Sequence, residues 1–220
     1  MNSHSPILSG LATSLGMALV TTQAATFIDL SAGLSSPPAI LGGHSMTLFV
    51  DDARANFTAV STVLSPLGGA LDFDSAASLR EIGDGWDTWS HGYAGDVYVA
   101  EGLTSLRLAL PPGTMAFSFH VQPDAWDVFE FQVESGGTGS GSFTVDGDSG
   151  ARFVGVYSTD PSVPLSSILI ENVDGNAGGF AVGEFAIAAV PEPATAAWLG
   201  ALGCLAFAAC RGRFQHFRSA

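Results

Sequence analysis

The sequence predicts an all-β protein, an antiparallel two-sheet β-sandwich of jelly-roll-like type. No amphipathic pattern of helix length occurs between Thr26 and Ala189. Instead, apolar and polar residues alternate in short runs, and Gly, Pro, Asp and Ser separate the runs. Alternation places successive side chains on opposite faces of a strand, and the separating residues favour turns. Only residues 75–82 form a short helical candidate.

The individual runs predict the strands in order. In the run Ser105–Leu110, for example, Leu106, Leu108 and Leu110 share one face and Arg107 lies on the other. The clearest runs are residues 96–100, 105–110, 115–121, 129–134, 143–145, 152–157, 165–173 and 178–189. Weaker runs are residues 27–30, 46–50 and 57–64. About nine to eleven strands suffice for two packed antiparallel sheets.

The charge of the chain excludes one class of partner. The 220 residues include 21 acidic residues and seven basic ones, and every basic residue is an arginine. All the acids lie between Asp29 and Glu192, where they face only four arginines, a formal charge of −17. Such a surface repels nucleic acid. It suits a solvated domain outside the cell, and solubility alone is the simpler interpretation.

The N-terminus predicts a signal peptide over residues 1–24. An apolar stretch runs from Ile7 to Val20, and the small residues Thr22 and Ala24 then fit the recognition positions of signal peptidase. Cleavage is expected between Ala24 and Ala25. The segment before the apolar stretch has no Lys or Arg, which departs from the usual pattern. A buried N-terminal helix is the alternative.

The C-terminus, residues 190–220, predicts a membrane anchor. The segment Val190-Pro191-Glu192-Pro193 precedes the uncharged residues 194–210. A helix over these residues would be about 26 Å long, enough for a thin bilayer. The basic residues that follow place the end of the chain in the cytoplasm and the acidic domain on the outer side of the inner membrane. These residues are Arg211, Arg213 and Arg218.

This order of Pro-Glu-Pro, apolar helix and arginine-rich end resembles the PEP-CTERM sorting signal of Gram-negative bacteria. The resemblance implies recognition by an exosortase, a membrane protease-transpeptidase, at Val190–Pro193. It also implies a membrane-anchored precursor that reaches the cell surface or an extracellular matrix of exopolysaccharide or biofilm. An unprocessed single-pass anchor is the alternative.

The domain between these ends, residues 25–189, carries a second resemblance. Segments 86–99, 110–124, 149–157 and 178–188 look like a β-rich domain that recurs in PEP-CTERM proteins. That resemblance implies a β-sandwich outside the membrane and no particular activity. Cys204 and Cys210 both lie in the apolar tail, so no disulfide framework is expected in the domain.

Loop aspartates are the candidate metal ligands. Asp84 with Asp87, and Asp146 with Asp148, offer oxygens of the kind that Ca²⁺ takes from carboxylates in turns. Neither pair has the spacing of an EF-hand, and aspartate is also a common turn residue. No other cofactor is expected. The histidines are scattered, and no His-x-His or His-Glu-x-x-His spacing predicts a zinc site.

An aromatic cluster offers the second candidate site. Trp86, Trp89 and Tyr93 lie close together in sequence and serve either to pack the sandwich or to stack on sugar rings. Glu130 and Glu134 share a strand face, but alternating acids are also typical of a solvated face. We therefore expect a non-enzymatic exported protein, with a carbohydrate-binding module or glycan hydrolase as the alternative.

Overall fold

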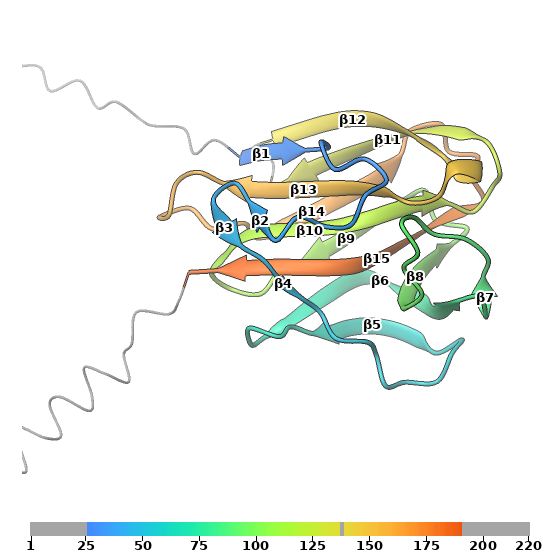
Figure 1. Cartoon of the computed structure of the whole chain (residues 1–220), viewed down its shortest axis with the longest axis horizontal. Helices are drawn as coiled ribbons and strands as arrows, with labels where there is room; N and C mark the ends of the chain where they lie inside the picture. Colours follow the sequence, from blue (N-terminus) through green and yellow to red (C-terminus); the bar gives the residue numbers. More distant parts are fainter. Residues whose placement is uncertain (1–25, 137–138, 191–220) are drawn as a thin grey trace, which may run out of the picture.

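Alternate side chains are buried along the strands, as the pattern predicts. In β11 (Val128–Ser135) the side chains of Phe129, Phe131 and Val133 are buried, while Glu130 is exposed. The computed structural model describes residues 26–136 and 139–190 (Figure 1). Within this part of the chain every regular element is a strand except for one 3₁₀ turn, so the all-β prediction is confirmed.

Fifteen strands follow one another along the described chain. In order they are β1 (Thr26–Asp29), β2 (Ile40–Leu41), β3 (His44–Ser45), β4 (Thr47–Leu48), β5 (Ala59–Leu64), β6 (Ala70–Ile82), β7 (Gly85–Trp86), β8 (Asp96–Glu101), β9 (Ser105–Ala109), β10 (Thr114–Pro123), β11, β12 (Gly139–Asp146), β13 (Arg152–Ser158), β14 (Ser167–Asn172) and β15 (Gly179–Ala189). The 3₁₀ turn η1 (Gly147–Ser149) lies between β12 and β13.

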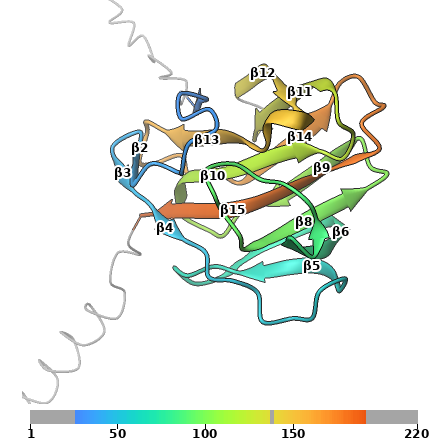
Figure 2. The ribbon, with the colours of Figure 1, turned by 45° about the vertical axis from the view of Figure 1, so that its right-hand side comes forward.

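Thirteen of the strands form one continuous sheet that folds over on itself, rather than the two packed sheets that the sequence predicts, and β2 and β3 form a separate two-stranded sheet. The order is β1-β13-β10-β15-β8-β6-β9-β14-β11-β12. The long strand β6 joins the two layers because its residues Ser78–Arg80 pair with β8 while Asp72–Phe73 pair with β9. At the other end of the order, Gly139 of β12 lies against the carbonyl of Thr26 in β1, so the sheet nearly closes (Figures 1 and 2).

The helical candidate at residues 75–82 is wrong, because these residues belong to β6. Ala77 and Leu79 are buried and alternate with partly exposed Ser78 and Arg80, which is the burial pattern of a strand. Pairing with β5 on one side and β8 on the other satisfies the backbone of this segment. Tertiary contacts therefore override the local preference for a helix.

The central strands are covered on both faces. All ten residues of β10 are buried. Between the layers lies the main core, whose largest members include Phe117, Phe119, Phe131 and Phe180. Two smaller clusters cover the outer face, one around Leu41 and Phe153 and the other around Trp86, Val97 and Val99.

The antiparallel register of β10 and β15 shows which residues lie at each end of the domain. Thr114 lies opposite Ala189 at one end, and Pro123 lies opposite Phe180 at the other. Between Ser118 and His120 the register shifts at a β-bulge, where β15 carries an extra residue.

Several expectations fall outside the described residues. They concern the signal peptide with Ala24 and Ala25, the residues Pro191, Glu192 and Pro193, the helix over 194–210, and Arg211, Arg213 and Arg218. They stay predictions. In the described ranges, no helix has the length and apolar character needed to cross a membrane.

Candidate functional site

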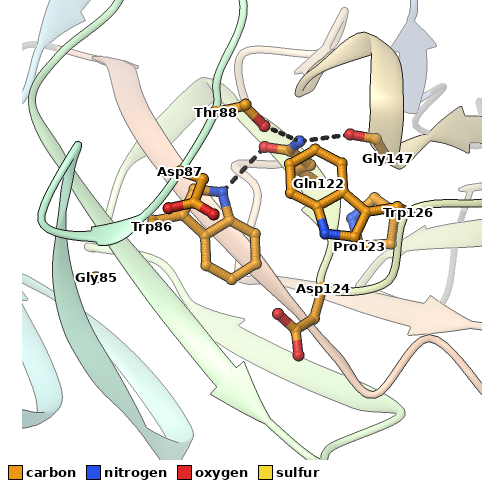
Figure 3. Close-up of a pocket in the computed structure, with 9 residues that line it drawn as sticks. All are labelled: Gly85, Trp86, Asp87, Thr88, Gln122, Pro123, Asp124, Trp126 and Gly147. Atoms are coloured by element: carbon orange, nitrogen blue, oxygen red, sulfur yellow. Dashed lines mark hydrogen bonds between the residues drawn. The ribbon is translucent and has the colours of Figure 1, made fainter.

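A cavity of about 190 Å³ opens at the end of β10. Its walls come from β7 and the residues after it, from the loop between β10 and β11, and from η1 (Figure 3). The side chains that give it chemical character are Trp86, Asp87, Thr88, Gln122, Asp124 and Trp126. We call this space the Gln122 cavity.

Gln122 fixes the floor of the cavity. Its side-chain oxygen accepts a 3.0 Å hydrogen bond from the indole Nε1 of Trp86. Its side-chain nitrogen donates to Thr88 Oγ1 at 2.9 Å and to the carbonyl of Gly147 at 2.8 Å. These three bonds, dashed in Figure 3, connect β10 to two loops and satisfy a buried amide. The three bonds therefore fix the orientation of the Gln122 amide.

Trp126 is the unusual residue of the site, because 56% of it is exposed. The loop that carries it is nonetheless well fixed. The backbone N–H of Asp124 donates to the carbonyl oxygen of Gly179, and the N–H of Ala125 donates to the carbonyl oxygen of Ala177, both at 3.1 Å. A large, rigidly presented indole in contact with solvent is typical of a surface that stacks on a ligand.

Gly147 allows this loop to approach η1. A Cβ atom at position 147 would lie 2.3 Å from the carbonyl oxygen of Ala125, which is closer than atoms can pack. The N–H of Gly147 also donates to the carbonyl of Asp127 at 2.9 Å. The absence of a side chain at position 147 thus lets η1 pack against the backbone of the loop that carries Trp126.

Two carboxylates, those of Asp87 and Asp124, complete the lining. Carboxylates accept hydrogen bonds and can take two hydroxyl donors at once. Together with the indoles they give the cavity an apolar stacking surface beside strong acceptors. It is smaller than the roughly 300–1,000 Å³ of sites for drug-sized ligands, and therefore suits a small group such as one ring.

The candidate calcium ligands have different surroundings. Asp146 caps η1, since its carboxylate accepts from the N–H of Asp148 at 3.0 Å and from Ser149 Oγ at 2.7 Å. Asp84 belongs to the turn between β6 and β7, and Asp87 lines the Gln122 cavity. None of the four belongs to a group of three or more potential metal ligands within the described ranges. Calcium binding stays a prediction.

Sequence reasoning found part of this site. Trp86 lines the cavity with its indole nitrogen bonded, whereas Trp89 and Tyr93 pack against each other with ring centroids 6.2 Å apart. Trp126 was missed, although a tryptophan between Asp124 and Asp127 in an expected loop is a recognisable signal. Val190, the described residue of the expected sorting motif, donates its N–H to the carbonyl of Gly113 at 2.9 Å.

No protein-family model and no curated protein matches the chain. Among solved structures, the chain is similar to the tandem CBM51 modules of a family 98 glycoside hydrolase from Streptococcus pneumoniae SP3-BS71, with a TM-score of 0.34 and 10% identity. The match covers 78% of this chain and 49% of that one, so the chain spans about half the length of the structure it resembles.

Proposed function

We propose that the β domain is a carbohydrate-binding module and that the Gln122 cavity is its binding site. The exposed indole of Trp126 beside the carboxylates of Asp87 and Asp124 supports this proposal. A sugar ring has an apolar face of C–H bonds that stacks on an indole, and hydroxyl groups at its edge that donate to carboxylates. Trp126 would thus contact the apolar face of the sugar, and the two carboxylates would accept hydrogen bonds from its hydroxyl groups.

The negative charge of the site limits the kinds of sugar that it can bind. Two carboxylates line the cavity, and the domain carries a strong net negative charge. Anionic sugars such as uronates would be repelled, because like charges oppose association. We therefore expect neutral sugars at this site.

Affinity electrophoresis tests the proposal with neutral glucan, galactan and mannan, and with a polyuronate as the anionic comparison. At least one neutral polysaccharide should retard the protein. Trp126→Ala should weaken binding about tenfold, which corresponds to ~1.4 kcal/mol. The control Leu64→Ala removes an apolar side chain that is 78% exposed on β5 and should leave binding unchanged.

Asp124→Asn is the second test variant and should also weaken binding, because it removes one of the two carboxylate acceptors. Glu171→Gln, on the exposed face of β14, is its matched control for the loss of one negative charge and should leave binding unchanged. Failure of every neutral polysaccharide to bind, or equal binding by Trp126→Ala, would overturn the proposal. Chromatography of the bound polysaccharide after incubation separates a binding module, which leaves it intact, from a hydrolase, which shortens it.

We also propose that this domain is exported and sorted through a PEP-CTERM-like tail. The support is the order of features in the sequence: a signal-like N-terminus, an acidic domain, Pro191-Glu192-Pro193, an apolar segment and terminal arginines. Mass spectrometry of the mature protein from fractionated cells tests this. The mature chain should begin at Ala25 and lack Arg211–Ala220. Retention of that segment would instead indicate an unprocessed anchor, and a full-length cytosolic chain would refute export.

A further inference from the structure

Three metal-ligating side chains that do not line the Gln122 cavity converge on the outer face of the sheet. His91 lies in the loop between β7 and β8, His120 in β10 and Glu184 in β15. Glu184 Oε2 is 3.0 Å from His91 Nε2 and 3.1 Å from His120 Nδ1. One ligand atom from each residue lies within 4.8 Å of the others.

The backbone at this cluster is held in unfavourable conformations. Glu184 is in the β-bulge of β15 with φ of 54°, and His91 has φ of 44°. Residues with a Cβ atom rarely adopt this left-handed region, because the Cβ atom crowds the backbone there. Such conformations gather at functional sites, where the direction of a side chain matters more than local stability.

The hydrogen-bond pattern of His120 leaves one buried ring nitrogen unsatisfied. His120 Nε2 is 3.1 Å from the carbonyl oxygen of Ser35, which only accepts, so Nε2 carries the proton. Nδ1 therefore carries the lone pair. It lies 3.1 Å from Glu184 Oε2, yet it is buried and makes no hydrogen bond within the described residues. A buried ring nitrogen without a hydrogen bond is costly, and a cation bound to Nδ1 would satisfy it.

We propose that His91 Nε2, His120 Nδ1 and the Glu184 carboxylate bind a divalent transition-metal ion, of which Zn²⁺ fits best. Two imidazole nitrogens and one carboxylate oxygen are a borderline donor set, typical of zinc sites with three protein ligands, whereas Ca²⁺ takes oxygen ligands. Tetrahedral ligands about 2.1 Å from zinc are ~3.4 Å apart. The two observed separations from Glu184 therefore need to widen only slightly.

Groups outside the ligands support this assignment. In each imidazole ring, the nitrogen that would not bind the metal contacts another residue. The carbonyl oxygen of Ser35 accepts from His120 Nε2, and the hydroxyl oxygen of the next residue, Ser36, lies 3.3 Å from His91 Nδ1. Partners of this kind orient the imidazoles of metal sites and fix their tautomers. Glu184 also lines a cavity of about 230 Å³ beside Tyr93 and Tyr98.

Titration calorimetry of the untagged, chelator-treated full chain with ZnCl₂ tests the proposal. We expect one Zn²⁺ per chain, with an affinity that His91→Ala and Glu184→Gln each reduce at least tenfold. These positions are preferred because His120 is fully buried, and its replacement risks unfolding the domain. His44→Ala is the matched control, since His44 is a half-buried histidine of β3 outside the cluster, and it should bind zinc as the parent chain does.

Cobalt substitution gives a second measurement that does not depend on affinity. Co²⁺ in the site should show the intense visible bands of tetrahedral coordination, and Glu184→Gln should abolish them, while circular dichroism confirms that the variant is folded. Absence of zinc binding, equal binding by both variants, or the weak spectrum of hydrated Co²⁺ would overturn the proposal. Because the cluster is separate from the Gln122 cavity, these results do not depend on the carbohydrate experiment.

Discussion

At the scale of single residues, the carboxylate of Asp52 is the centre of a small polar network. It forms an ion pair with Arg54, and it accepts a hydrogen bond from the Tyr98 hydroxyl at 3.2 Å. Arg54 in turn donates to the carbonyl of Thr62 in β5 at 2.9 Å. The loop before β5 is thus attached to strands β5 and β8 by polar contacts.

This network predicts a pH dependence of stability. The hydrogen bond from Arg54 is the main reason why the pKa of Asp52 lies below its ordinary value of 3.8. Because the folded state favours the ionised form, the stabilisation is present above that value and is lost as the pH falls through the folded-state pKa. Asp52→Asn should therefore cost about 1 kcal/mol near pH 7 and much less near pH 3.

Urea denaturation at the two pH values measures this difference, and Glu171→Gln controls for removal of a charge at an exposed position. A difference between Asp52→Asn and the parent chain that did not shrink at low pH would contradict the role given to this carboxylate.

At the scale of elements, the hairpin of β2 and β3 covers the outer face of the sheet. Gly42 and Gly43 form its turn with φ of 58° and 85°, and Leu41 packs against Phe153. Tyr157 lies directly beneath the turn, and its ring also stacks on Phe27 at 5.5 Å.

The two glycines of the turn should respond differently to substitution. A Cβ atom at Gly42 would lie 2.2 Å from the ring of Tyr157, whereas one at Gly43 would meet no atom within 4 Å. Both alanines are strained by positive φ, but only Gly42→Ala must displace the ring, which adds ~1–3 kcal/mol. Thermal denaturation should rank Gly42→Ala well below Gly43→Ala. Equal stability would show that Tyr157 adapts without cost.

The strands themselves were largely predictable, because alternation is a local property. The residues around Phe131 and Leu108 repeat with a period of two, and the structure buries them as expected. The β2–β3 hairpin was not predicted, although consecutive glycines are a hairpin signal. Residues 75–82 were misjudged as helical, because the pairing of β6 with its neighbours is not visible in the local sequence.

At the scale of the whole molecule, the sites depend on pairings between distant segments. His91, His120 and Glu184 meet only because β10 lies beside β15 and the loop after β7 crosses their outer face. Their spacing along the chain matches no metal motif, so the sequence indicated no zinc site. Trp86 and Trp126 likewise share a cavity only through Gln122 and the close approach allowed by Gly147.

The register of β10 and β15 has a consequence for how the domain stands on a surface. β10 has ten residues, and at ~3.3 Å per residue its ends are roughly 30 Å apart. The Gln122 cavity is at one end, while Val190, where the described chain stops, is at the other beside Gly113. If the segment after Val190 is attached to a membrane or matrix, the full height of the domain separates that attachment from the proposed binding site, which then points toward the surrounding medium.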